Sequence, residues 1–132
     1  MTKAMVMLLP LFALVGCQIH PAQYSALDVG VANNQPCFIV PSTSLSGALT
    51  ATAPTITRLN GRQWQVLTSG ATWQPTRAIT AGDCTGWPGI NWQPGVYDIA
   101  FKVSAKDRAT RYAARFVVQQ NGDGKIAVHQ QE

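Results

Sequence analysis

Apolar and polar side chains alternate along much of this chain, and a period of two residues is typical of β-strands rather than of helices. The alternation is clearest in residues 96–103 and 110–118, which are joined by a polar stretch. One face of this pair is apolar and consists of Tyr97, Ile99, Phe101 and Val103 from the first segment and Tyr112, Ala114, Phe116 and Val118 from the second. The other face carries Arg111 and Arg115. We therefore expect an antiparallel hairpin with one face in water.

Five shorter segments show strand-like patterns: residues 27–31, 37–40, 56–59, 64–67 and 125–129. The third and fourth of them flank Asn60-Gly61-Arg62, and Asn-Gly is a strong hairpin signal. Residues 42–55 are mostly Ser, Thr, Ala, Gly and Pro, which predicts a loop or a weak edge region. With about seven short strands and no helical period, the sequence predicts an all-β fold, a small antiparallel β-sandwich formed by residues 27–132.

The amino-terminal residues have a different pattern, that of a secretory signal peptide. A short basic start precedes an apolar run over residues 4–15. This run is too short for a stable transmembrane helix, and Pro10 interrupts it. It ends in Leu14-Val15-Gly16-Cys17, which resembles the lipobox of bacterial lipoproteins.

The lipobox implies where the mature chain resides. Residues 1–16 would be cleaved as the signal peptide, Cys17 would carry the lipid, and residues 17–26 would tether the domain to the membrane. Gln18 stands where lipoproteins kept in the inner membrane often have Asp, so we expect the inner leaflet of the outer membrane, facing the periplasm. An ordinary signal peptide followed by a chance cysteine is the alternative interpretation.

The remaining cysteines fit an oxidising compartment. If Cys17 carries lipid, Cys37 and Cys84 are left as an even pair, and we expect a disulfide that closes a loop of about 48 residues. Two free thiols or part of a metal site are the alternatives. Neither cysteine has another Cys or a His near it in sequence, so we expect no metal ion.

Composition argues against several classes of function. Once Lys3 leaves with the signal, nine basic side chains remain against six acidic ones, and a net charge of +3 is too small and too dispersed for nucleic-acid binding. The histidines are His20, in the tether, and His129, near the carboxyl terminus. No hydrolase, metalloprotease, redox or nucleotide-binding motif accompanies them. We therefore expect neither an enzyme nor a cofactor.

Tryptophan is unusually concentrated in the middle of the chain, where Trp64, Trp73, Trp87 and Trp92 lie within 29 residues. Trp64 alternates with Val66 in a predicted strand, which favours a core position. The other three precede prolines that mark turns, so they either fill the core or form an exposed aromatic surface. Because Trp and Arg dominate interface hot spots, the candidate partner-binding residues are Trp73, Trp87 and Trp92, with Arg77 nearby.

Several motifs are similar to those of a family of small proteobacterial lipoproteins, the type VI secretion system immunity periplasmic lipoproteins. They are the lipobox at Cys17, Asn34-Gln35-Pro36-Cys37-Phe38, Cys84-Thr85-Gly86-Trp87-Pro88, Gly95-Val96-Tyr97-Asp98 and Arg111-Tyr112-Ala113-Ala114-Arg115-Phe116. The resemblance implies a membrane-anchored protein that binds and neutralises a cognate secreted effector toxin. Two other classes stay open: a structural or assembly lipoprotein of the outer membrane, and a peptidoglycan- or carbohydrate-binding lipoprotein.

Overall fold

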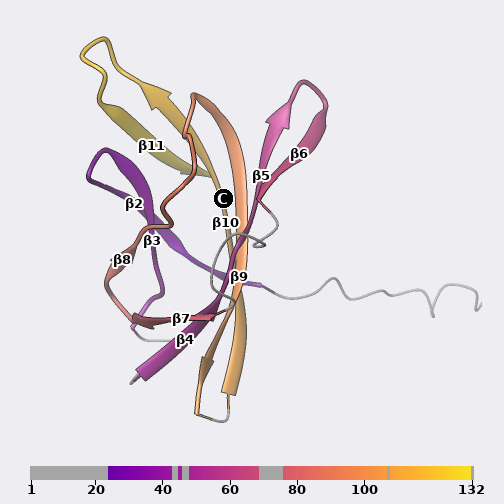
Figure 1. The fold of residues 1–132 in the computed structure, drawn as a ribbon, viewed down its shortest axis with the longest axis vertical. Helices are drawn as coiled ribbons and strands as arrows, with labels where there is room; N and C mark the ends of the chain where they lie inside the picture. The colour runs from indigo at the N-terminus through magenta and orange to yellow at the C-terminus, as the bar shows by residue number, and fades with distance from the viewer. Residues whose placement is uncertain (1–23, 43–44, 46–47, 69–75, 107, 132) are drawn as a thin grey trace, which may run out of the picture.

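The computed structural model describes residues 24–42, 45, 48–68, 76–106 and 108–131. These residues form eleven β-strands and no helix, which confirms the predicted all-β class. The strands are β1 (Ser25–Ala26), β2 (Asp28–Ala32), β3 (Gln35–Ile39), β4 (Ala48–Thr52), β5 (Thr55–Asn60), β6 (Gln63–Thr68), β7 (Thr76–Thr80), β8 (Cys84–Thr85), β9 (Gly95–Ala105), β10 (Arg108–Gln120) and β11 (Ile126–Gln131). They form one sheet of eight strands and one of three, and neither sheet closes on itself (Figure 1).

The long hairpin of β9 and β10 is the centre of the larger sheet, as the alternating pattern predicts. Its two strands pair antiparallel from Gly95 with Val118 to Ala105 with Arg108. β4 and β5 both pair with β9, while β1 and β11 both pair with β10. β7 then extends β4, and β6 extends β5. Because β1 and β11 each cover part of β10, and β4 and β5 each cover part of β9, this hairpin organises all the other strands of its sheet.

The predicted inward face of this hairpin is the core of the molecule. Seven of its eight predicted side chains are at most 5% exposed, and Ala114 is half-buried. The three-stranded sheet, formed by β2, β3 and β8, contributes Phe38 to the same core. The ring of Phe38 lies 5.5 Å from that of Phe116, and Phe116 stacks on Tyr97 at 5.6 Å. Burying rings of this size is worth about 2–3 kcal/mol each, so these contacts hold the two sheets together.

Two short turns show how the local sequence sets the strand register. Asn33 and Asn34, with φ of 52° and 58°, join β2 to β3. Asparagine tolerates this left-handed conformation, which the type I′ hairpin turn requires twice. The predicted hairpin at Asn60 is also confirmed, because Gly61 and Arg62 join β5 to β6. Gly61 has a φ of 68°, and a type II′ turn needs glycine at this first central position.

The expectation of a loop or weak edge in residues 42–55 is wrong. This region contains β4, which lies inside the larger sheet between β9 and β7. Leu49 and Ala51 are buried and alternate with exposed Ala48 and Thr50, so β4 has the two-residue period of a strand.

Two other boundaries differ from the prediction. The fold begins before residue 27, because β1 (Ser25–Ala26) pairs in parallel with Tyr112 and Ala113 of β10, within the predicted tether. The number of strands is eleven rather than about seven, since β1, β4, β7 and β8 were not expected. The cleavage site and Cys17 lie outside the described residues.

The predicted disulfide between Cys37 and Cys84 is confirmed. The bond joins β3 to β8 across a Cα–Cα distance of 5.1 Å and links positions 47 residues apart. Gly30 on β2 faces the bond, and a Cβ at this position would lie 3.3 Å from the Cys84 sulfur. The disulfide therefore ties β3 to β8, and a side chain at Gly30 would fit only if the Cys84 sulfur shifted by a few tenths of an ångström.

We expect removal of the disulfide to destabilise the fold markedly. Replacing both cysteines, Cys37→Ala with Cys84→Ala, should lower the free energy of unfolding by about 3–4 kcal/mol, because the unfolded chain gains the freedom of a long loop. Urea denaturation of the oxidised wild type and the double variant measures this difference. A loss below about 1 kcal/mol would show that the bond constrains little.

Two buried tyrosines differ in their hydrogen bonds and offer a matched test of the core. The Tyr97 hydroxyl donates to the Gln93 carbonyl (2.6 Å) and accepts from the Gln93 amide (2.9 Å). The Tyr112 hydroxyl is buried with no hydrogen-bond partner among the described residues. Tyr97→Phe should therefore cost about 1 kcal/mol of unfolding free energy, and Tyr112→Phe should cost nothing or stabilise the protein. Equal losses in urea denaturation would contradict this assignment.

Candidate partner-binding surface

Trp87, predicted as a partner-binding residue, is a core residue. It is 4% exposed and lies edge-on to Phe101 at 5.8 Å. The Arg77 guanidinium covers the outer side of the indole at 5.0 Å and donates a hydrogen bond of 2.7 Å to the Gly86 carbonyl. Arg77 is exposed, but its contacts clamp the loop over Trp87. The proline-marked loop does turn here, yet its indole points inward, so of the two positions left open for Trp87 the structure shows the core one.

Trp92 is half-buried and also belongs to the aromatic core. Its ring lies 5.0 Å from Tyr97, 5.9 Å from Phe116 and 6.4 Å from Phe38. Two of the aromatic residues of the central hairpin and the one from β3 thus meet on this indole. Trp92 therefore contributes mainly to packing between the sheets. Trp73, the third predicted indole, lies outside the described residues.

For Trp64 the sequence favours a core position, but in the structure the side chain is 38% exposed. It lies on β6, the outer strand of the β5–β6 hairpin, which extends beyond the part of the sheet that the core covers (Figure 1). Alternation with Val66 correctly places both side chains on one face of β6, but that face is turned to solvent: Val66 is 57% exposed. The sequence prediction thus missed the most exposed indole of the described chain.

An arginine from the central hairpin holds the Trp64 indole. The Arg115 guanidinium lies 4.7 Å from the centre of the Trp64 ring. The same guanidinium donates two hydrogen bonds to Asp98, from Nε to Oδ1 at 2.7 Å and from Nη2 to Oδ2 at 2.9 Å. Bidentate geometry of this kind fixes the plane of the guanidinium, so Asp98 aims Arg115 at the indole.

The charges of Arg115 and Asp98 balance each other, and both side chains are partly exposed to solvent. The hydrogen bond to Asp98, followed by the attraction between the two charges, raises the pKa of Arg115 above its ordinary value. About half of the Arg115 side chain and over a third of the Asp98 side chain remain exposed, at 51% and 37%. An exposed ion pair contributes at most about 1 kcal/mol to stability. Its structural effect is therefore to orient Arg115 rather than to hold the fold together.

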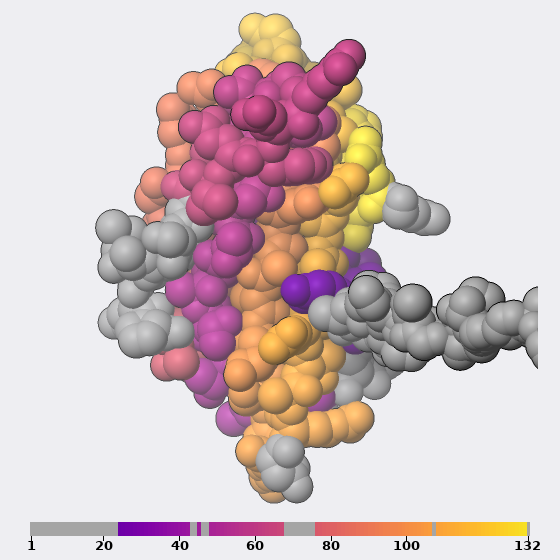
Figure 2. Space-filling model, turned by 90° about the vertical axis from the view of Figure 1, so that its right-hand side faces the viewer, coloured from indigo at the N-terminus to yellow at the C-terminus, as the bar shows by residue number. Residues whose placement is uncertain are grey.

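These residues belong to the face of the larger sheet that points away from the core. Asp98 on β9 and Arg115 on β10 are direct cross-strand neighbours there. Figure 2 looks onto this side of the molecule, with the β5–β6 hairpin in magenta above and β9, β10 and indigo β1 across the centre. We call this side the open face, and define it by Trp64, Val66, Asp98, Ala113 and Arg115.

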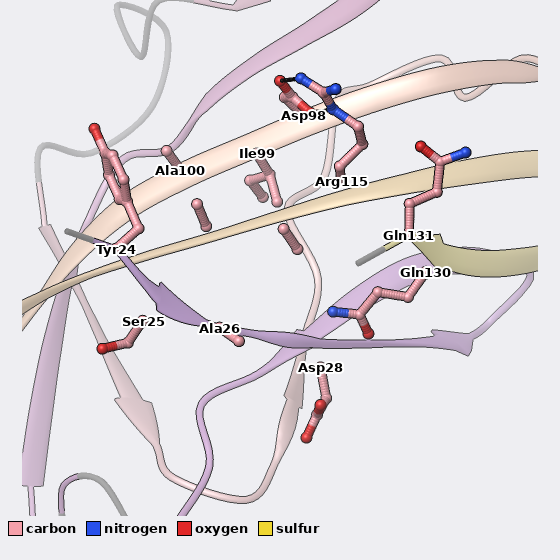
Figure 3. Close-up of a pocket in the computed structure, with 12 residues that line it drawn as sticks. Tyr24, Ser25, Ala26, Asp28, Asp98, Ile99, Ala100, Arg115, Gln130 and Gln131 are labelled. Atoms are coloured by element: carbon pink, nitrogen blue, oxygen red, sulfur yellow. Dashed lines mark hydrogen bonds and ion pairs between the residues drawn. The ribbon is translucent and has the colours of Figure 1, made fainter. Parts of the chain in front are cut away.

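A shallow depression of about 920 Å³ lies beside the ion pair on the open face. Small side chains line much of it, among them Ala26, Ala100 and Ala113. Asp98, Arg115 and Gln131 also line it (Figure 3). Gln130 closes one end, where its amide nitrogen donates to the Leu27 carbonyl at 2.5 Å and its oxygen accepts from the Val29 amide at 3.1 Å. The depression thus marks the place where the chain passes from the larger sheet to the smaller one.

The described residues contain no group of three or more His, Cys, Asp or Glu side chains that could hold a metal ion. Within the same residues there is no helix of the length and apolar character that spanning a membrane requires. What the open face does contain is an oriented Trp–Arg pair beside apolar positions, a combination typical of protein interfaces.

Comparisons with protein-family models, with curated proteins and with solved structures found no match for this chain.

The two indoles Trp87 and Trp64 provide a direct test of these positions. Trp87→Ala should lower the free energy of unfolding by about 3–5 kcal/mol, because it leaves a cavity against Phe101. Trp64→Ala should change it by less than about 1 kcal/mol, since the ring is partly solvated. Urea denaturation followed by circular dichroism measures both. The reverse order of the two losses would contradict the assignment of core and surface.

Proposed function

We propose that this chain is a membrane-anchored periplasmic immunity lipoprotein that binds and neutralises a secreted type VI effector toxin. The lipobox at Cys17 supports the location, and the resemblance of the sequence motifs supports the class. The observation that carries the proposal is the exposed Trp64 indole, which Arg115 holds on the open face. A neutraliser needs a rigid, accessible surface that a partner can cover, and Trp and Arg supply most of the binding energy in such interfaces.

Several of the residues that carry the resemblance have structural roles in the fold. Cys37, Phe38, Cys84, Trp87 and Tyr97 supply the disulfide and part of the core. Motifs shared for such reasons favour a common scaffold, which we propose to be a small sandwich in which the three-stranded sheet covers part of the larger one. Asp98, Ala113 and Arg115 of the open face belong to these motifs, whereas Trp64 and Val66 lie outside them. The part of the open face that selects a particular toxin is therefore proposed to be β6.

A coexpression experiment tests the function. Any secreted protein encoded beside this reading frame is a toxin candidate, and each is exported to the periplasm of a sensitive host together with this chain. We expect the wild type to restore growth, and Trp64→Ala or Arg115→Ala to weaken toxin binding about 30-fold or more, the equivalent of ~2 kcal/mol. Calorimetry with the purified pair measures the affinity.

Arg111→Ala is the matched control. Arg111 lies on β10, four residues before Arg115, and is exposed. Its removal should leave growth and affinity within a factor of about two. Failure of the folded, exported wild type to restore growth would contradict the immunity function and favour an envelope-assembly or glycan-binding role.

The anchor has its own test. Cys17→Ser should shift the chain from the membrane fraction to the soluble periplasmic fraction and abolish labelling with radioactive palmitate, because the thioether cannot form. Membrane association that persists in this variant would contradict lipidation at Cys17.

A further inference from the structure

One edge of the larger sheet is apolar and unpaired. β6 pairs with β5 on one side, and no described strand pairs with its other side. Among the described residues, three of the five exposed large hydrophobic side chains lie on this one strand: Trp64, Val66 and Leu67. The strand extends outward in Figure 1, away from the smaller sheet. An edge of this kind offers a row of free backbone groups to another strand.

β6 lacks the features that usually protect an edge strand. Its sequence, QWQVLT, contains no lysine, no proline and no charge, whereas charged residues and prolines commonly block pairing at such edges. By contrast, β7, at another edge of the same sheet, carries Arg77. The composition of β6 therefore favours pairing with a further strand rather than discouraging it.

The hairpin geometry identifies the backbone groups that face outward. A two-residue turn makes Asn60 and Gln63 a hydrogen-bonded pair. Such pairs alternate with pairs that are not hydrogen-bonded, so Trp64 opposite Leu59 and Val66 opposite Thr57 direct their amides and carbonyls away from β5. These two residues also place their side chains on the open face, so backbone and side chains present one continuous surface.

The charges around β6 indicate what kind of strand would fit. Arg62 lies in the turn, Arg115 lies beside Trp64, and Arg58 stands on β5. Neither β5 nor β6 contains an acidic residue, and the charges of Asp98 and Arg115 balance each other. The net positive charge at this edge therefore comes from Arg62 and from Arg58, which lies on the opposite face of β5 and donates to the Pro94 carbonyl at 2.7 Å. An incoming strand with carboxylates would complement this surface. A second copy of this chain would instead bring a second set of arginines to it.

We infer that β6 is a β-augmentation site that accepts an extended, acidic strand of the partner protein. The strand would form backbone hydrogen bonds with Trp64 and Val66 and place its apolar side chains beside them on the open face. Its alternate residues would direct carboxylates to the opposite face, toward Arg58 and toward Arg62 in the turn. This inference rests on the proposed function for the identity of the partner, the toxin. The pairing itself depends only on the edge strand and its surroundings.

A peptide experiment tests the pairing without the toxin. The probe is a capped octapeptide of alternating valine and glutamate, and the charge control has lysine in place of glutamate. We expect the acidic peptide to bind at least about tenfold more tightly than the basic one at low salt. In amide hydrogen exchange by NMR, its binding should slow exchange at Trp64 and Val66 and leave Gln65, already bonded to β5, unchanged. Equal affinity for both peptides, or no protection at Trp64 and Val66, would overturn the inference.

A proline variant separates strand pairing from side-chain contact. Val66→Pro removes an outward amide that β5 does not use, and proline is tolerated at such edge positions. It should abolish amide protection and weaken peptide binding more than tenfold, roughly the value of a lost strand pairing. Val66→Thr keeps the amide and should weaken binding less than about fivefold. Circular dichroism and the urea midpoint establish that both variants fold, and amide exchange at Arg58, which pairs with Gln65 across the hairpin, reports the integrity of the hairpin in each variant.

Two further outcomes would overturn the inference. If sedimentation shows a dimer of this chain that Val66→Pro dissociates, the occupant of the edge is a second copy. If Val66→Pro neutralises the toxin as well as the wild type does, the function stands and the docking mode is wrong. Loss of neutralisation by the wild type with intact peptide pairing would instead contradict the proposed function alone.

Discussion

The stacking of Tyr97 on Phe116, with Phe38 and Trp92 packed against the pair, is the interaction on which the fold depends. Phe38 comes from the smaller sheet and the two stacked rings come from the central hairpin, so this cluster joins the two sheets. Aromatic pairs of this kind contribute about 0.5–1.5 kcal/mol each beyond the burial of their surface. The disulfide then fixes the strands from which Phe38 projects.

This one-sided core determines where a partner can bind. The central hairpin directs its large apolar side chains to one face, and its charged residues necessarily lie on the other. Asp98 and Arg115 meet there across the strands, and Arg115 in turn orients Trp64. The same strand alternation that builds the core thus places an oriented Trp–Arg pair in solvent, next to the unpaired edge of β6.

The sequence predicted the elements whose local signal is strong. The central hairpin, the turn after Asn60, the all-β class and the Cys37–Cys84 disulfide are all confirmed. β4 was missed because its alternation uses Ala, Leu and Thr, which look like loop composition until a neighbouring strand is present.

The indoles show a different limit of sequence reasoning. Alternation tells which face of a strand a residue occupies, but not whether another layer covers that face, so Trp64 was expected in the core. Proline correctly indicated loops near Trp87 and Trp92, yet tertiary packing turns both rings inward. Whether a side chain is exposed depends on how the sheets pack together, and the sequence of a single strand does not reveal this.

Hydroxyl-radical footprinting of the indoles, in the free chain and in its complex with the toxin, tests the central claim most directly. In the free protein Trp64 should be oxidised faster than Trp87 and Trp92. In the complex, Trp64 should lose most of its reactivity while the other two keep theirs. Unchanged reactivity of Trp64, with protection appearing at Trp87 or Trp92, would contradict the assignment of the open face as the binding surface.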